Sequence, residues 1–492
     1  MRASSETDPA VRSRRAFLFG DGESPKGGPQ PRPRFRTAAV TEVAPAPAAW
    51  KDPVARLLRR ATMGLTADDL AAAKQTGYSA WLDRQLKPAR VADDAVTQAL
   101  ATRYPLLALP AEQLATANGN TVVQQLQQAT VFRAAFSRRQ LFERMVEFWS
   151  DHFNISVNKV GYLKVVDDRD VIRKYALGRF GDLLRASAKS PAMLAYLDQT
   201  QSRSGRPNQN YAREVMELHT LGVDGGYTQT DVAELSRVLT GWTIQGRGNF
   251  YFDPNGHDWG SKTVLGLTIP AGSPSLGQKG IEEGERILDL LVNHPSTARF
   301  IAAKMLRWLL TAEPTDSQVR TIAGVYRATG GDISAMVRAI LNDAWVTASP
   351  AKFKRPFHYI VSATRVLGPT VTATDPLYNQ INVIGQPLFV YETPDGYPDR
   401  TEYWSGNIVP RWNAAMSLAN LRTAAVTVDA APYLTGGAAG ALDAIAQRIF
   451  GGEISPSTRT ALQSYLAAGA VNETRVRETI GLALAAADFQ WY

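Results

Sequence analysis

The sequence predicts an all-α protein, a large helical bundle-like unit with a small β-hairpin insertion. From residue 49 onward, most of the chain places apolar residues three and four positions apart, the spacing of amphipathic helices. An alternation of period two, typical of strands, appears around residues 250–252 and is followed by a second apolar run at 263–269. The composition, with 45% hydrophobic and 20% charged residues, is that of a globular chain.

Composition and charge exclude several classes of protein. The 492 residues include no cysteine, which excludes disulfides, thiolate metal ligands and a cysteine nucleophile. No run approaches eighteen consecutive apolar residues, so we expect no membrane span. Most of the formal charge of +8 belongs to residues 1–60, which contain twelve Lys or Arg and six Asp or Glu. Because the rest is nearly neutral and carries no nucleic-acid-binding motif, we expect no nucleic-acid partner.

Residues 1–48 are rich in Pro, Arg, Gly and Ser, and we expect a disordered basic tail that is dispensable for folding. Within it, Arg14 and Arg15 in the run SRRAFL resemble a twin-arginine export signal. The apolar segment that should follow is missing, because the chain continues as GDGESPKGGPQPRPR. This favours a cytoplasmic location, with the periplasm as the alternative.

Residues 49–245 form the predicted N-terminal helical region. Helices are expected to begin at Pro53, after a Thr66 cap and at Gly77. The longest helical pattern runs from 121 to 154. Its apolar arc includes His152, and the acidic residues Glu143, Glu147 and Asp151 lie on the opposite side.

The region ends in a segment, residues 208–242, that is unusually rich in ionisable side chains. A helical wheel places His219 on the core-facing arc, together with Tyr211, Ala212, Val215, Met216 and Leu218. Gly222 is expected to end this helix, and Thr228 or Thr230 to cap the next one.

Two further regions complete the chain. Residues 246–280 are predicted to form the β-hairpin insertion, in which strands at 250–252 and 263–269 flank a connecting segment with His257, Asp258 and Lys262. Residues 281–492 are predicted to be a C-terminal helical region. It contains a long ordered loop at 368–411, where Pro and Gly are frequent and no periodicity is visible.

Several motifs resemble those of the bacterial proteins grouped as domain of unknown function 1800. The motifs are MLAYLD, PNQNYAREVMELHTLGVDGGYT, DVAELSRVLTGW, HDWGSKTVLG, HPSTARFIAAKMLRWL, KFKRPFHYIVSATRVLG, GQPLF and PDGYP. The resemblance covers about residues 50–490 and implies a mostly helical protein with no settled activity. It also implies a neighbouring gene for a sulfatase-like, often exported protein of the domain of unknown function 1501 group. Gln209 replaces the acidic residue that is usual in the family's Asn-Glu-Asn-Tyr motif.

The histidines on apolar arcs, His152 and His219, admit two interpretations. They are either buried, neutral side chains of the core or a pair that acts across two helices as metal ligands or as acid and base. Glu147 and Glu214 each precede one of them by five residues, whereas di-iron bundles use Glu-x-x-His. The sequence contains no His-Glu-x-x-His zinc motif, no Gly-x-Ser-x-Gly elbow and no Walker-type phosphate loop.

The candidate catalytic residues are Glu214, His219, His257 and Asp258, and we expect them to form one site with Glu214 at its rim. The leading hypothesis is a hydrolase-type enzyme that acts on a polar, envelope-associated substrate by acid–base chemistry. The alternative is a non-catalytic partner or maturation factor of the co-encoded sulfatase-like protein, in which the same residues form a buried polar network. The sequence identifies neither a cofactor nor a metal ion.

Overall fold

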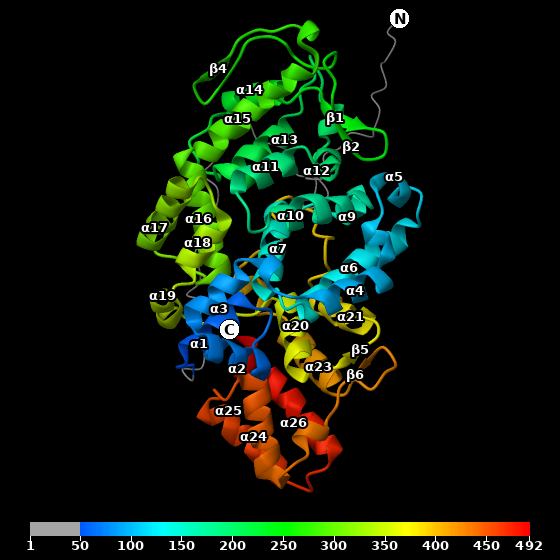
Figure 1. The fold of residues 1–492 in the computed structure, drawn as a ribbon, viewed down its shortest axis with the longest axis vertical. Helices are drawn as coiled ribbons and strands as arrows, with labels where there is room; N and C mark the ends of the chain where they lie inside the picture. The colour runs from blue at the N-terminus through cyan, green and yellow to red at the C-terminus, as the bar shows by residue number, and fades with distance from the viewer. Residues whose placement is uncertain (1–49) are drawn as a thin grey trace, which may run out of the picture. The chain divides into compact units, whose positions relative to one another are not determined.

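The computed structural model describes residues 50–492, so the predicted tail and its twin-arginine run lie outside the described residues. The all-α prediction is confirmed, with short two-stranded antiparallel sheets as the β structure of the described chain (Figure 1). The helices up to the first strand are α1 (Pro53–Ala61), α2 (Ala67–Thr76), α3 (Tyr78–Gln85), η2 (Pro88–Arg90), α4 (Asp94–Arg103), η3 (Pro105–Ala108), α5 (Ala111–Leu114), α6 (Gly119–Phe136), α7 (Gln140–His152), α8 (Val157–Val160), α9 (Leu163–Asp167), η4 (Asp168–Ile172), α10 (Arg173–Tyr175), α11 (Phe180–Ala188), α12 (Pro191–Tyr196), η5 (Gln199–Gln201), α13 (Gln209–Glu214), η6 (Val215–Thr220) and α14 (Gln229–Val238).

The remaining helices and the strands follow in the second half of the chain. The helices are η7 (Pro274–Gly280), α15 (Ile281–Asn293), α16 (Pro295–Leu309), α17 (Asp316–Thr329), α18 (Ile333–Ile340), α19 (Asp343–Ala348), α20 (Pro356–Leu367), α21 (Asp375–Ile384), α22 (Thr401–Trp404), α23 (Ile408–Ala419), η8 (Ala431–Tyr433), α24 (Gly437–Phe450), α25 (Pro456–Ala467), α26 (Glu473–Ala485) and α27 (Ala487–Gln490). The strands are β1 (Trp242–Gln245), β2 (Asn249–Phe252), β3 (Lys262–Val264), β4 (Leu267–Ile269), β5 (Thr370–Val371) and β6 (Val426–Thr427).

Local side-chain caps fix several helix starts where the sequence predicts them. The Thr66 hydroxyl accepts a hydrogen bond from the backbone N–H of Asp69 at the start of α2. Thr228 forms a reciprocal capping box with Asp231 at the start of α14. Both caps satisfy backbone N–H groups that have no partner inside the helix.

The β structure between residues 242 and 269 differs from the predicted single hairpin. Strand β2 pairs with the preceding β1, in the register Trp242↔Phe252, and β3 pairs separately with β4. Glycines with positive φ, Gly246 and Gly248, form the short β1–β2 turn, and Leu265 and Gly266 form the β3–β4 turn. Tight turns of this kind make the nearest strands pair, so the predicted long-range pairing does not form.

The segment expected to be a long loop, residues 368–411, is partly helical. It contains α21 and α22, and α23 begins at Ile408, which leaves residues 385–400 as the irregular stretch. Pro376 occupies the first turn of α21, where a proline needs no backbone N–H donor. The prolines that suggest a loop therefore start a helix here.

Two clusters of buried apolar side chains form the core. The first joins α1–α3 and α7 with α11–α18, and the second joins α6 with α20, α21 and α23–α26. In the view of Figure 1, α7 lies between α10 and α20. Trp149 of α7 is fully buried, and its indole N–H donates to the carbonyl of Ala176, 3.0 Å away. No helix of residues 50–492 has the length and apolar content needed to span a bilayer.

Candidate functional site

Helix α7 carries a row of acidic side chains that faces the protein interior. Glu143, Glu147 and Asp151 are four residues apart and therefore share one face of the helix. This face borders a cavity. The space in it that the centres of water molecules can occupy is about 40 Å³, which leaves room for a few waters. The cavity is lined by Met63, Thr130, Ala134, Glu143, Val146, Glu147, Ser150, Asp151, Asn154, Asp168, Phe357, Gln386, Leu388, Phe389 and Tyr397.

Glu147 is an acidic residue of this cavity with an incomplete set of hydrogen-bond partners. Its Oε2 lies 3.4 Å from Nη1 of Arg144, and its Oε1 is buried without a hydrogen-bond partner. Burial raises the pKa of Glu147 to about 7, although the nearby Arg355 and Arg144 oppose the shift. The carboxyl group can therefore give up or accept a proton near neutral pH.

Asp151, one turn further along α7, is paired with Arg355 at the start of α20. Their closest atoms, Oδ2 and Nη2, are 2.6 Å apart in an ion pair that lacks hydrogen-bond geometry. Burial raises the pKa of Asp151, and Arg355 opposes this shift. The guanidinium of Arg355 packs 5.1 Å from the ring of Trp308 and 5.8 Å from that of Trp404. Its Nε and Nη2 atoms have no hydrogen-bond acceptor within the described chain.

The irregular segment 391–399 closes one side of this cluster. The side-chain amide of Asn154 donates to the carbonyl oxygens of Tyr391 and Thr393, at 3.0 and 2.8 Å. Gly396 has φ +73°, and a Cβ atom at this position would overlap the carbonyl oxygen of Asp151. A glycine is therefore required where this segment crosses the end of α7.

The two core-facing histidines lie against each other. The rings of His152 and His219 are 6.2 Å apart, and Nε2 of His152 lies 3.1 Å from the carbonyl oxygen of His219. Burial, with a smaller effect of Lys304, lowers the pKa of His219 to about 3 and that of His152 well below its usual value. One nitrogen of each ring, Nδ1 of His152 and Nε2 of His219, has no hydrogen-bond partner among residues 50–492. Both side chains are therefore neutral at physiological pH.

Local helix geometry explains one difference from the predicted wheel. Residues 215–220 form a π-helix, in which the Thr220 hydroxyl donates to the carbonyl of Val215. The wider turn rotates side chains relative to a wheel drawn at 100° per residue, and Leu218 is half-buried instead of fully core-facing. His219 remains buried.

Glu214 lies close to the same segment 391–399. Burial and the neighbouring Glu217 raise the pKa of Glu214 to about 7, and Asp395 of the segment adds to the shift. Burial lowers the pKa of Lys304 to about 8, against the effects of Asp151 and Asp395. The charge of Lys304 therefore affects the pKa values of both His219 and Asp151. The charge of Asp395 affects those of Glu214 and Lys304.

His257 and Asp258 have a different set of partners. Nδ1 of His257 lies 2.7 Å from the carbonyl oxygen of Thr240, and its Nε2 lies 3.2 Å from Glu283. Asp258 accepts two hydrogen bonds from Arg237, at 2.8 and 3.2 Å. These bonds lower the pKa of Asp258.

Across residues 50–492, no hydrogen bond or ring contact joins this pair to Glu214 or His219. The predicted residues thus form two groups by their contacts. His219 lies against His152 of α7, and Glu214 is near enough to Asp395 for that carboxylate to raise its pKa. His257 lies between β2 and α15, and Asp258 is paired with Arg237 of α14.

We expect the Glu283→Gln substitution to destabilise the protein by about 3–5 kcal/mol, the usual cost of breaking a buried ion pair. Burial disfavours the Glu283 carboxylate, but hydrogen bonds from His257 and Lys262 outweigh this effect and lower its pKa. The substitution removes the counter-ion of the buried Lys262, whose Nζ is 2.7 Å from Glu283. Urea unfolding measures the loss, and Glu282→Gln, at an exposed neighbour, is the control. Equal stability of the two variants would contradict this account.

Sequence reasoning missed most of the residues around the α7 cavity. Glu147 and Asp151 lie opposite the apolar arc, which usually indicates a solvent-facing side. Lys304, Arg355 and Tyr397 belong to motifs that had no assigned role. The available signal was the spacing of four between three acidic residues on a helix whose neighbours are strongly apolar.

Within residues 50–492, no group of three or more His, Asp or Glu side chains is arranged to hold a metal ion. The model of one protein family, described as "Protein of unknown function (DUF1800)", matches residues 56–491. No curated protein and no solved structure matches the chain. Because the match spans nearly the whole described chain, this protein belongs to the DUF1800 family.

Proposed function

We propose that the protein is an enzyme that hydrolyses a polar substrate by acid–base chemistry in the α7 cavity. The observation that carries this proposal is the pairing of two unlike carboxyl groups on one cavity wall. Glu147 has a pKa of about 7 and a free oxygen atom, whereas Asp151 is held against the Arg355 guanidinium. Pairs of carboxyl groups with different environments are a common basis of acid–base catalysis.

The proposed reaction uses Glu147 as the general acid and Asp151 as the general base. The protonated Glu147 donates its proton to the leaving group as the substrate bond breaks. The Asp151 carboxylate removes a proton from the attacking water, whose oxygen forms the new bond. The proton then returns from Asp151 to Glu147 through solvent, and the net change is the addition of one water molecule.

Arg355 has the role of holding Asp151 ionised and of binding negative charge that develops on the substrate. Its Nε lacks an acceptor within the described chain, and an unpaired buried donor is costly unless a ligand completes it. The cavity also contains the Asn154 and Ser150 side chains as further polar groups. These features support a polar substrate, whereas its association with the cell envelope rests on the family resemblance alone.

The wider hypothesis, in which Glu214, His219, His257 and Asp258 act together, remains a proposal. The effects of Asp395 on the pKa of Glu214 and of Lys304 on the pKa of His219 favour a role for these two residues as charge-tuning neighbours of the cavity. Hydrogen bonds favour a supporting role for His257 and Asp258, whose polar atoms are engaged by Thr240, Glu283 and Arg237.

The non-catalytic alternative, a partner of a sulfatase-like protein, makes a different prediction. A binding role needs no proton transfer at Glu147, so the Glu147→Gln variant would still bind the partner protein. An acid–base enzyme loses its activity in the same variant. The two functions are therefore separable by one substitution.

The test is hydrolysis of 4-nitrophenyl esters, phosphates, sulfates and glycosides by the purified full-length chain. We expect turnover with one class and a bell-shaped pH profile, because Glu147 must be protonated and Asp151 ionised. The alkaline limb is expected near pH 7, the pKa of Glu147. Asp151→Asn should abolish turnover. Turnover that survives both Glu147→Gln and Asp151→Asn would overturn the proposal.

A further inference from the structure

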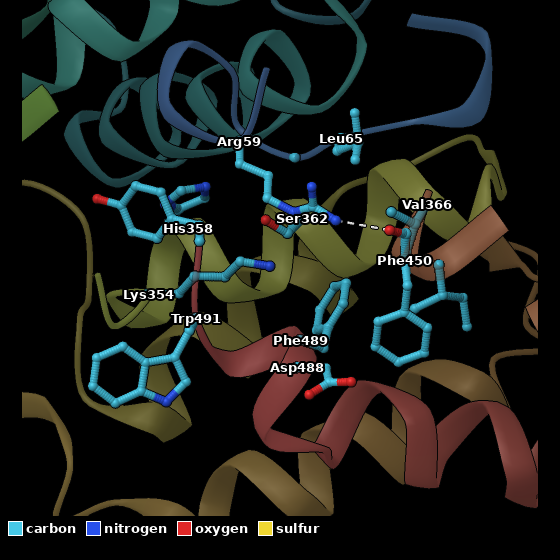
Figure 2. Close-up of a pocket in the computed structure, with 13 residues that line it drawn as sticks. Arg59, Leu65, Lys354, His358, Ser362, Val366, Phe450, Asp488, Phe489 and Trp491 are labelled. Carbon is cyan, nitrogen blue, oxygen red and sulfur yellow. Dashed lines mark hydrogen bonds between the residues drawn. The ribbon is translucent and has the colours of Figure 1, made fainter. Parts of the chain in front are cut away.

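A second cavity, separate from the α7 site, lies between α1, α20 and the C-terminal helix α27 (Figure 2). Its volume, about 20 Å³ for the centres of water molecules, has room for one or two water-sized particles. Its polar lining consists of Arg59, Lys354, His358, Ser362 and Asp488, and apolar and aromatic side chains complete the wall.

The ammonium group of Lys354 forms no ion pair within residues 50–492. The residue is 6% exposed, and Nζ keeps some contact with solvent, because it is not one of the fully buried polar atoms that lack a partner. Figure 2 shows the side chain extending into the cavity beside the ring of Phe489, with Nζ 3.8 Å from the ring centroid. Burial, together with Arg59 and Arg411, lowers the pKa of Lys354 well below its usual value.

His358, one turn further along α20, also lacks partners. It is 1% exposed, and neither of its ring nitrogens forms a hydrogen bond in the described chain. After burial, the groups that lower its pKa are all cations, with Arg144 the strongest, followed by Lys354. A buried histidine normally has at least one hydrogen-bond partner, so the lack of any partner at His358 within the described chain needs an explanation.

The other polar groups of the wall are already engaged. Arg59 pairs with Glu453 at 2.9 Å and donates to the carbonyl of Phe450 at 2.7 Å. Asp488 accepts a hydrogen bond from the backbone N–H of Ser455 at 2.6 Å and forms no ion pair with Lys354. The groups of this cavity without an ion-pair or hydrogen-bond partner in the described chain are therefore the Lys354 ammonium and both ring nitrogens of His358.

We propose that this cavity binds a small monovalent anion, of the size of chloride, between Lys354 and His358. An anion accepts hydrogen bonds from the Lys354 ammonium and from the N–H group of His358, and it balances the charge of Lys354, which pairs with no carboxylate in the described chain. The volume fits a monatomic anion without rearrangement of the wall. A bound anion would join α1, α20 and the C-terminal residues, and would thereby stabilise the fold.

The test compares thermal unfolding of the full-length chain in potassium chloride and in potassium gluconate at equal ionic strength. We expect the Tm to rise with chloride, by roughly 1–3 °C for each tenfold increase above the Kd, and not with gluconate. Lys354→Met should remove the difference between the two salts. Lys262→Met, which removes a buried lysine with its own carboxylate partner, should lower the Tm but keep the difference.

Bromide provides a readout that needs no variant. Crystals of the wild-type chain grown in bromide should show an anomalous scattering peak in contact with Lys354 and His358. A peak there supports the proposal even where Lys354→Met fails to fold. The absence of a bromide peak, with equal Tm values in the two salts, would show that the cavity holds water and would overturn the proposal.

Discussion

Glu147→Gln should abolish hydrolysis while increasing stability at alkaline pH. The amide has the shape of the carboxyl group but cannot donate an acidic proton, and loss of a general acid typically slows a reaction by about 10²–10⁴-fold. The stability effect has a separate origin. Burial raises the pKa of Glu147 from 4.5 in the unfolded reference state to about 7, so the folded protein binds more protons between these values.

The sign of the pH dependence follows from this difference. Where the folded state binds more protons than the unfolded state, the free energy of unfolding falls as the pH rises. The contribution of Glu147 is complete below pH 4.5 and is lost as the pH passes 7, a change of about 3 kcal/mol. Glu147→Gln should remove this slope, and urea unfolding at a series of pH values measures it.

Glu143→Gln is the matched control for this prediction, because Glu143 lies one turn earlier in the same acidic row. Its carboxylate pairs with Arg173, so its loss leaves a half-buried guanidinium without a counter-ion. We expect Glu143→Gln to lower stability across the pH range. An unchanged pH slope in Glu147→Gln would contradict the raised pKa, and unchanged turnover would contradict the catalytic role.

Gly396→Ala should displace segment 391–399 or destabilise the protein by about 2–5 kcal/mol. The backbone at this position has φ +73°, which an alanine adopts at a cost of about 1–3 kcal/mol. A Cβ atom also overlaps the carbonyl oxygen of Asp151, and overpacking of this kind adds about 1–3 kcal/mol. Thermal unfolding measures the destabilisation, and hydrogen exchange of the amides in 391–399 measures a displacement. Either result should be accompanied by loss of turnover.

Gly368→Ala separates the two causes. Gly368 ends α20 with φ +56°, and a Cβ atom there has no neighbour within 4 Å. This variant therefore reports the conformational strain without the steric overlap. We expect it to lose less stability than Gly396→Ala and to retain turnover. An equal loss of stability in the two variants would show that the steric overlap with α7 does not contribute to the destabilisation by Gly396→Ala.

The sequence alone determined the features that depend on neighbours in the chain. The helical periodicity predicted the fold class, and the caps formed by Thr66 and Thr228 predicted two helix starts, because these interactions join residues three or four positions apart. The burial of His152 and His219 also followed from their position on apolar arcs. The motifs were specific enough to identify the family.

The tertiary structure alone decided which of these residues meet. A helical wheel shows that Glu147 and Asp151 share a face, but whether solvent or protein covers that face depends on the packing of distant segments. Arg355 and segment 391–399 reach α7 only in the folded chain, where burial shifts the pKa of Glu147 and Asp151. The contacts of His257 depend on tertiary packing for the same reason, because its neighbours Thr240 and Glu283 are set by how β1, β2 and α15 pack together.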